Sequence, residues 1–251
     1  MPEPLIQFRN VRKSFGPQTV LDGIDLAIEE GQVTAIIGRS GVGKSVLLKH
    51  VVGLLSPDQG EILYRNKSLA RLSRSERRGL KRRFSYMFQS LALFDSMTIF
   101  ENVALPLQEK TRLPKAAIRE KVLQRLEQLE LRDIPEKYPA QISGGMRKRV
   151  ALARALITDP EIILFDEPTT GLDPIRKTTV HNMIARYQRK FGFTAVVVSH
   201  DIPDVFSITQ KVAMLEKGKI LFEGTPAEIE ACPDPAVQQL IQGQEEPDNS
   251  A

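Results

Sequence analysis

The chain has 251 residues, of which 41% are hydrophobic and 26% are charged, and its formal net charge is +4. This composition is ordinary for a globular protein, and no apolar run approaches the roughly 18 residues that a membrane-spanning helix needs. The single cysteine, Cys232, excludes an intrachain disulfide and a cysteine-based zinc site. We expect no signal peptide, because the first residues lack a basic region followed by an apolar one.

Hydrophobic spacing predicts strands and helices that alternate along most of the chain. Strands are expected at 4–15, 19–32, 32–38, 60–66, 83–89, 161–167 and 193–200. Helices are expected at 43–55, 114–131, 143–158 and 174–190, followed by a hairpin at 211–223. This alternation indicates an α/β fold with a parallel sheet and helices on its faces. We expect the acidic tail, 245–251, to be disordered.

Positive charge is concentrated in residues 71–83, where seven residues are basic and one is acidic. Such a run is consistent with a solvated helix face. It is also consistent with a position near anionic lipid headgroups or an acidic partner. The sequence leaves both interpretations open.

Residues 38–45, GRSGVGKS, fit the phosphate-loop pattern G-x-x-x-x-G-K-[ST] and stand between a predicted strand and a predicted helix. In that context, backbone N–H groups and the helix N-terminus face phosphate oxygens. Lys44 would reach the β- and γ-phosphates, and Ser45 would ligate Mg²⁺. The residues expected to bind nucleotide here are Gly38, Arg39, Ser40, Gly41, Val42, Gly43, Lys44 and Ser45.

The apolar strand expected at 161–167 ends in two carboxylates, Asp166 and Glu167. Asp166 lies at the carboxyl edge, where parallel sheets bind ligands, and we expect it to hold Mg²⁺ through water. Glu167 could act as general base on the water that attacks the phosphate. A solvated strand end could carry the same pair, but its occurrence with a phosphate loop favours a ligand site.

Ser143, Gly144 and Gly145 form a second loop suited to close approach of the backbone to a ligand, and a basic helix is expected directly after it. Two nucleotide-binding classes are excluded. A GTPase would carry an [NT]-K-x-D motif, which is absent. An ATPase with a coiled-coil arm would carry heptads between its glycine-rich loops, but the 97 residues between Ser45 and Ser143 contain one short helical pattern.

Three single residues have structural explanations when each is taken alone. Gln89 and His200 end predicted strands, and Phe15 lies in the N-terminal strands, where a lone aromatic residue is usually part of a core. Their order and spacing relative to the phosphate loop give them functional weight.

The order of these motifs resembles that of an ABC transporter ATPase subunit over about residues 5–230. The resemblance implies an α/β P-loop NTPase fold. It also implies a single ABC nucleotide-binding domain at 1–244, with an N-terminal antiparallel β subdomain and a helical subdomain at about 90–158. ATP and Mg²⁺ are the implied ligands, and ATP hydrolysis is the implied activity. Two chains would enclose two ATP molecules around a two-fold axis.

In this family the Ser-Gly-Gly loop binds the γ-phosphate of the ATP held by the other chain's phosphate loop. The resemblance therefore implies that 38–45 acts within its own chain, whereas Ser143, Gly144 and Gly145 act on the partner's nucleotide. Met146 departs from the family pattern, which has Gln there, and Met cannot make that side chain's hydrogen bonds.

The resemblance also implies a role for each of four further residues. Gln89 matches the residue that contacts Mg²⁺ and senses the membrane partner, and His200 matches the switch histidine near the γ-phosphate. Asp173, within GLDP at 171–174, matches a dimer contact, and Phe15 takes the place of the aromatic residue that stacks on adenine. With Lys44 and Glu167, Gln89 and His200 complete the residues expected to take part in catalysis.

Several further segments are similar to the ATPases of the Mla/MCE phospholipid transport systems. They are SGGM, FQSLALFDSMTIFENVALPL, VVVSHDIPDVFSI and PDPAVQQLIQG. The similarity implies phospholipid transport between membranes and a peripheral location on the cytoplasmic face of a bacterial inner membrane. The implied partners are a second copy of the chain, transmembrane permease subunits, an MCE-domain lipid-binding protein and a small STAS-domain subunit, with no nucleic acid.

Three alternatives remain. An importer ATPase for a small polar solute, such as an amino acid, would carry the same motifs. A soluble ABC protein of translation usually has two cassettes in one chain, whereas this chain has one. A soluble ABC protein of DNA repair has zinc cysteines or a coiled coil, and this chain has neither. A regulatory subunit that binds ATP without turnover would not need Glu167 and His200.

Residues 90–107, SLALFDSMTIFENVALPL, are too apolar for a loop that contacts only water. One possibility is that most of them are buried in the helical subdomain. The other is that several line a groove for an amphipathic helix of a permease. The residues concerned are Leu93, Phe94, Met97, Ile99 and Phe100.

Overall fold

The computed structural model describes residues 3–88 and 91–243. The chain divides into two compact units, the first comprising 1–77 and 164–251 and the second 78–163. The second unit contains the segment predicted as a helical subdomain. Gln89 and the tail 245–251 lie outside the described residues. No helix within 3–88 and 91–243 is long and apolar enough to span a membrane.

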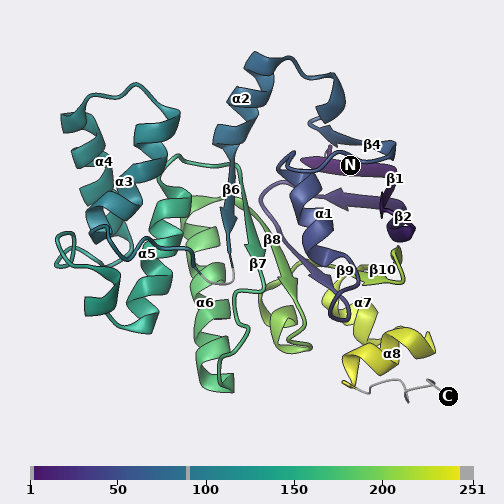
Figure 1. The fold of residues 1–251 in the computed structure, drawn as a ribbon. Coiled ribbons are helices and arrows are strands. Elements are labelled where there is room, and N and C mark those ends of the chain that lie inside the picture. The colour runs from purple at the N-terminus through teal and green to yellow at the C-terminus, as the bar shows by residue number, and fades with distance from the viewer. Residues whose placement is uncertain (1–2, 89–90, 244–251) are drawn as a thin grey trace. The chain divides into compact units, whose positions relative to one another are not determined.

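The first unit opens with an antiparallel sheet in the order β2-β1-β4-β5 (Figure 1). Its strands are β1 (Ile6–Phe15), β2 (Gln18–Ile28), β4 (Gln59–Tyr64) and β5 (Lys67–Ser68). Phe8 pairs with Leu26 of β2 and Ile62 of β4, and all three side chains are buried. The antiparallel subdomain predicted from the sequence is confirmed, because alternate residues of these strands bury one apolar face.

A second sheet follows the order β10-β9-β3-β8-β7-β6. Within the first unit it contains β3 (Val33–Ile37), β8 (Thr194–Ser199), β9 (Lys211–Glu216) and β10 (Lys219–Gly224). β7 (Ile162–Asp166) crosses the border between the units. β3 is parallel to β8 and β9, and every residue of β3 and β8 is buried. Burial on both faces explains why these strands are continuous apolar runs.

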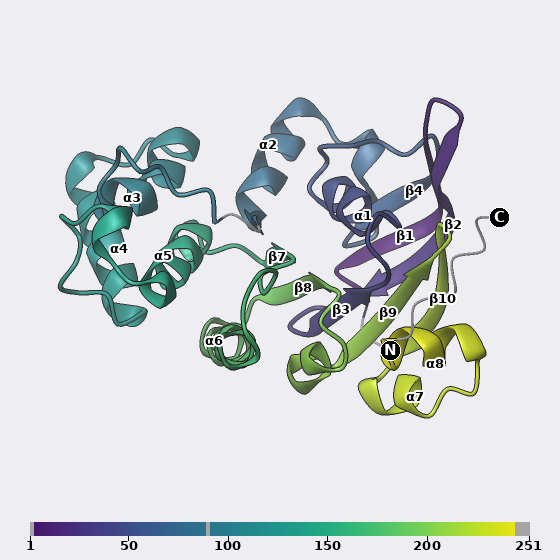
Figure 2. The same cartoon turned by 60° about the horizontal axis from the view of Figure 1, so that its bottom comes forward.

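The first unit also contains two helices that carry residues of the predicted site, α1 (Lys44–Val51) and α6 (Pro174–Phe191). α1 is shorter than predicted, because Gly53 adopts a left-handed conformation (φ 67°) just after the helix. Two short helices, α7 (Pro226–Glu230) and α8 (Pro235–Ile241), follow β10, and α7 packs on β9 and β10 (Figure 2). Two 3₁₀ turns are η1 (Leu69–Arg71) and η3 (Asp204–Ile208).

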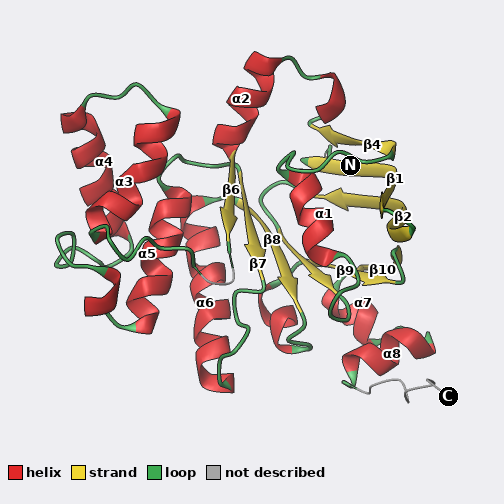
Figure 3. Cartoon of the chain, viewed as in Figure 1, coloured by secondary structure: helices red, strands yellow, loops and turns green. Residues whose placement is uncertain are grey.

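The second unit contains β6 (Phe84–Met87) and a group of three packed helices (Figure 3). They are α3 (Ile99–Lys110), α4 (Lys115–Gln128) and α5 (Gly144–Leu156), and a 3₁₀ turn, η2 (Pro139–Gln141), precedes α5. Val103, Val122 and Val150, one from each helix, are fully buried. α2 (Arg74–Arg83) crosses the border between the units and buries none of its residues.

α3 is a helix that the apolar spacing of the sequence did not predict. It starts with a capping box in which Thr98 accepts from the Glu101 amide (3.1 Å) and Glu101 accepts from the Thr98 amide (2.7 Å). The continuous apolar composition of 90–107 and the internal Pro106 obscured the helical period.

Candidate functional site

Residues 38–43 connect the buried strand β3 to α1, in the strand–loop–helix order that a phosphate loop requires. Gly38 has φ 152°, and a Cβ atom there would lie 2.3 Å from the Leu215 carbonyl oxygen. Gly43, at the start of α1, has φ 110°. Side chains at these positions would be strained or would clash, so the loop conformation explains both glycines.

The Lys44 side chain is held within this loop. Its Nζ donates hydrogen bonds to the carbonyl oxygens of Gly38 and Arg39, each at 2.8 Å, and the residue is 4% exposed. Burial lowers the pKa of Lys44, while the negative charges of Glu167 and Asp166 oppose that change. The loop therefore fixes a cation beside the N-terminus of α1.

The N-terminus of α1 is suited to an anion. Gly43 provides no side-chain cap, and the first turn contains no acidic residue. The first N–H groups of a helix have no partner within the helix and form the positive end of its dipole. Together with Lys44 they can bind phosphate oxygens.

Ser45 and Asp166 come together from α1 and the carboxyl end of β7. Ser45 Oγ donates a 2.9 Å hydrogen bond to Asp166 Oδ1. A hydroxyl and a carboxylate are oxygen ligands of the type that Mg²⁺ prefers. Among the described residues, no group of three or more His, Cys, Asp or Glu side chains could hold a metal ion. The donor set therefore fits a cation that takes its other ligands from phosphate and water, as Mg²⁺ usually does.

Glu167 lies next to Asp166 in a left-handed backbone conformation, with φ 49°. Its amide donates to the Val198 carbonyl oxygen of β8 (3.0 Å), which fixes this turn. Glu167 Oε2 accepts from Thr170 Oγ1 (2.8 Å) and lies 3.3 Å from His200 Nδ1. Glu167 Oε1 is 4.0 Å from Lys44 Nζ. The structure thus brings the predicted Lys44, Ser45, Asp166, Glu167 and His200 into one cluster.

The sequence analysis missed two residues that adjoin this cluster, Asp201 and Lys177. Asp201, directly after His200, has a side chain that is 2% exposed and forms an ion pair with Lys177 of α6. The Asp201 amide also donates to Ser199 Oγ (3.0 Å). Burial raises the pKa of Asp201, but hydrogen bonds from Lys177 and Thr169 outweigh it, so the pKa is below its usual value. No local sequence signal identifies this pair, because its partners are joined only by the fold.

Phe15 and Asp173 also belong to the first unit. Phe15 is 46% exposed, and Lys13 Nζ lies 5.5 Å from the centre of its ring. This exposure excludes the alternative that Phe15 is an ordinary core residue. Asp173 caps α6 by accepting from the Arg176 amide (3.0 Å). The tight turn before α6 is therefore stabilised by Asp173 itself.

In the second unit, Ser143 begins α5, and its Oγ accepts from the Met146 amide (3.2 Å). Gly144 and Gly145 are exposed helical residues. A Cβ at Gly145 would meet nothing within 4 Å, and one at Gly144 would only touch Arg147 at 3.7 Å. Neither the packing nor the backbone of this chain requires glycine here, so an external ligand is the simpler explanation for these glycines.

The segment after Gln89 is pinned to the second unit. The buried Asn102 side chain donates to the carbonyl oxygens of Phe94, Met97 and Thr98. Arg154 donates to the carbonyl oxygens of Leu91 (2.6 Å) and Ala92 (2.7 Å), and burial lowers its pKa. Sequence analysis missed both anchoring side chains.

The apolar residues of this segment divide into two groups. Ile99 is fully buried, whereas Phe94 is 49% exposed. Leu93, Met97 and Phe100 are half-buried. Burial in the helical subdomain therefore accounts for Ile99, whereas Phe94 is left exposed.

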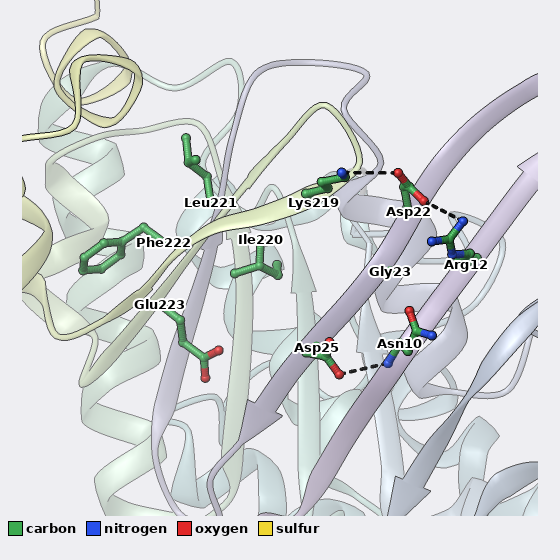
Figure 4. Close-up of a pocket in the computed structure, with 10 residues that line it drawn as sticks. All are labelled: Asn10, Arg12, Asp22, Gly23, Asp25, Lys219, Ile220, Leu221, Phe222 and Glu223. Atoms are coloured by element: carbon green, nitrogen blue, oxygen red, sulfur yellow. Dashed lines mark hydrogen bonds and ion pairs between the residues drawn. The ribbon is translucent and has the colours of Figure 1, made fainter.

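A separate hollow of about 540 Å³ lies in the first unit, beside β1, β2 and β10 (Figure 4). Three of its charged side chains are paired with one another: Asp22 lies 3.2 Å from Arg12 and 3.6 Å from Lys219. Asp25 accepts from the Asn10 amide (2.9 Å). None of the residues expected to bind nucleotide or metal lines this hollow.

Comparisons with known proteins point to one family. A family model described as "ABC transporter" matches residues 21–170. The intermembrane phospholipid transport system ATP-binding protein MlaF of Escherichia coli K12 is 41% identical over 239 residues, which are 95% of this chain and 89% of MlaF. This result confirms the resemblance drawn from the motifs.

Solved structures show the same fold. The structure of cbiO1 from Clostridium perfringens, part of the ABC transporter complex cbiONQ, has a TM-score of 0.83 and 30% identity, covering 92% of each chain. The dimeric ATP-binding cassette MJ0796, bound to ADP and Pi, has a TM-score of 0.74 and 32% identity, covering 88% of this chain and 98% of MJ0796. With the phosphate loop and the cluster at the ends of β7 and β8, these matches show that the chain belongs to the ABC transporter family and is one of its ATP-hydrolysing subunits.

Proposed function

We propose that the chain hydrolyses ATP to power the movement of phospholipid between membranes. The observation that carries this proposal is the similarity to MlaF along 95% of the chain, which includes segments outside the shared nucleotide motifs. The cluster around Lys44 and Glu167 supports the hydrolytic part.

Each residue of the cluster has a proposed role. Lys44 and the backbone N–H groups of Gly38, Arg39, Ser40, Gly41, Val42, Gly43 and Ser45 bind the phosphates of ATP. Ser45, Asp166 and Gln89 would hold Mg²⁺, which would neutralise phosphate charge. Phe15 supplies an exposed ring for adenine.

Glu167 acts as general base. Its carboxylate lies beside the phosphate loop and is oriented by Thr170, so it can accept the proton of the attacking water. In this proposal His200 contacts the γ-phosphate, and the 3.3 Å distance between its Nδ1 and Glu167 Oε2 supports a role beside the general base. Charge that develops on the phosphoryl oxygens is stabilised by Lys44 and the loop amides.

The complete site requires a second copy of the chain. Ser143, Gly144 and Gly145 bind the γ-phosphate of the partner's ATP, and Asp173 lies at the contact between copies. The space around Gly144 and Gly145 supports this arrangement, as does the dimeric state of MJ0796. Two glycine-rich loops in one chain then serve two different ATP molecules.

Transmembrane permease subunits are the proposed membrane partners. Phe94 is exposed on a segment that hydrogen bonds from Asn102 and Arg154 anchor, so it can receive the apolar face of a permease helix. Because Gln89 precedes this segment, binding of that helix can influence Mg²⁺ and closure around ATP. An MCE-domain lipid-binding protein and a small STAS-domain subunit complete the complex, at the cytoplasmic face of a bacterial inner membrane.

Purification of the complex from native membranes tests the cargo. We expect the chain to copurify with permease subunits, an MCE-domain protein and bound phospholipid. A complex that contains an amino-acid-binding protein and no phospholipid would exclude the lipid cargo and favour import of a small polar solute. The ATPase assignment would be unaffected.

A matched pair of variants tests the permease contact. Phe94→Glu should leave the fold intact and abolish capture of the permease. Leu123→Glu places the same charge on a comparably exposed leucine of α4, 37% exposed, and should capture the permease normally. Equal behaviour of the two variants would remove Phe94 from the proposed interface.

A further inference from the structure

α2 has one face composed only of basic side chains. With about 100° of rotation per residue, Arg74, Arg77, Arg78, Lys81 and Arg82 fall within an arc of about 140°. All five residues are exposed. The opposite side of the helix carries Glu76, the half-buried Leu80 and Arg83. The helix is therefore divided into a basic face and a side that contacts the rest of the chain.

Local interactions hold this helix without using most of the basic face. The Ser73 amide donates to Glu76 (2.8 Å), and the Glu76 amide donates to Ser73 Oγ (3.3 Å), which stabilises the first turn. Arg77 donates to the carbonyl oxygens of Ala70 and Leu72. Arg83 pairs with Glu161 at 2.7 Å. These contacts orient the helix and leave four of its cations outward.

Within residues 3–88 and 91–243, Arg74, Arg78, Lys81 and Arg82 form no ion pair with an acidic side chain. Lys110 of α3 adds a further cation, since its Nζ lies 3.4 Å from the Lys81 carbonyl oxygen. Uncompensated charge of one sign along a helix attracts a surface of opposite charge.

We propose that this basic face of α2 binds the anionic phospholipid headgroups of a bilayer surface. The inference rests on the proposed function, because it assumes that the chain works at a membrane. The centre of a protein interface usually carries aromatic or large apolar side chains, and the basic arc has none. A charged bilayer surface needs no complementary shape and attracts each nearby Lys or Arg.

The mode of binding follows from the composition of the helix. α2 has no continuous apolar face, so it does not insert into the acyl region. It adsorbs to the headgroups through charge alone, and this interaction is screened by salt. α2 leads directly into β6, so the membrane contact lies close in sequence to Gln89 and the proposed permease segment.

Cosedimentation of the full chain with vesicles tests the proposal. We expect binding to vesicles of 70% phosphatidylcholine and 30% phosphatidylglycerol at about 0.1 M salt, and loss of binding at about 0.5 M salt. The triple variant R74Q/R78Q/R82Q should bind about 100-fold more weakly, at about five-fold per charge. The variant R74K/R78K/R82K keeps the charges and should bind within about three-fold of the natural chain.

A charge-matched control separates this face from net charge. Arg112, Lys115 and Arg119 are exposed residues at and before the start of α4. Their triple Gln variant removes the same charge and should bind vesicles within about two-fold of the natural chain. Circular dichroism and ATP affinity should be unchanged in every variant.

The proposal would be overturned by equal binding to pure phosphatidylcholine vesicles, by equal loss of binding in the two Gln variants, or by no vesicle binding at all. The proposal would also be overturned if the R74Q/R78Q/R82Q variant bound vesicles normally and lost only its affinity for a polyanion such as RNA. None of these results bears on the phospholipid content of the purified complex, so the cargo proposal is tested separately.

Discussion

Lys177 of α6 forms an ion pair with Asp201, whose buried carboxylate directly follows His200 in the chain. Asp173 caps the N-terminus of the same helix. His200 Nε2 lies 3.9 Å from Asp201 Oδ1, and its Nδ1 lies 3.3 Å from Glu167. The pair therefore connects the helix capped by Asp173 to the histidine of the site.

Replacing Lys177 with Met should affect both stability and turnover. The variant leaves a buried carboxylate without its cation, which we expect to reduce the free energy of unfolding by about 2–3 kcal/mol. Displacement of His200 should lower kcat about 10- to 100-fold with little change in KM for ATP. Lys177→Arg keeps the charge and should recover most of kcat. A stability loss with unchanged kcat would limit the pair to a structural role.

Glu167→Gln should bind ATP and hydrolyse it roughly 10²- to 10⁴-fold more slowly. The amide keeps the shape of the side chain but cannot accept the proton of the attacking water. With ATP the variant should elute as a stable dimer in size-exclusion chromatography. A monomer with normal turnover would show that another group acts as the base.

Mixed dimers test whether the Ser-Gly-Gly loop acts on the partner's nucleotide. Ser143→Arg should stop hydrolysis and leave ATP binding to the same chain intact, whereas Lys44→Ala should lose ATP binding because it removes the cation at the phosphates. A dimer with one chain of each kind has one intact composite site and one site with both changes, so it should regain part of the activity. Loss of ATP binding by isolated Ser143→Arg monomers would contradict the proposal.

Stability should depend on pH through two buried histidines. Burial is the main cause of the lowered pKa values of His50 and His181, and the nearby Asp201 and Asp204 partly oppose it for His181. Below about pH 6.5 the unfolded chain therefore binds more protons than the folded chain. The free energy of unfolding is highest above that pH and decreases as the pH falls below it. The Tm should decrease from about pH 7.5 to 5.5. His181→Phe should reduce this slope, and an unchanged slope would exclude His181 as a contributor.

The parts of the site that could be predicted from sequence are those built from neighbouring residues. The phosphate loop and Asp166-Glu167 stand at the ends of apolar strands, so their position follows from local pattern alone. His200 is similar, because it directly follows the fully buried β8. Strand ends of a parallel sheet meet at one edge, and the cluster follows from that rule.

Other features depend on contacts between distant residues. Lys177 and Asp201 are 24 positions apart, and no periodicity predicts their pairing. Asn102 and Arg154 anchor the Phe94 segment by donating to backbone carbonyl groups. Every residue has such a carbonyl group, so no sequence pattern predicts these contacts. α3 is an intermediate case, since the Thr98 and Glu101 capping box was visible as a helix start but the apolar run concealed the helix.

The most direct test of the account is ATP-driven phospholipid movement in proteoliposomes that contain the chain and its permease. The natural complex should transfer labelled phospholipid at a rate that depends on ATP. The Glu167→Gln complex should bind ATP and transfer lipid at least about 100-fold more slowly. Lipid transfer at the same rate without ATP, or ATP-dependent uptake of a polar solute with no lipid transfer, would contradict the proposed function.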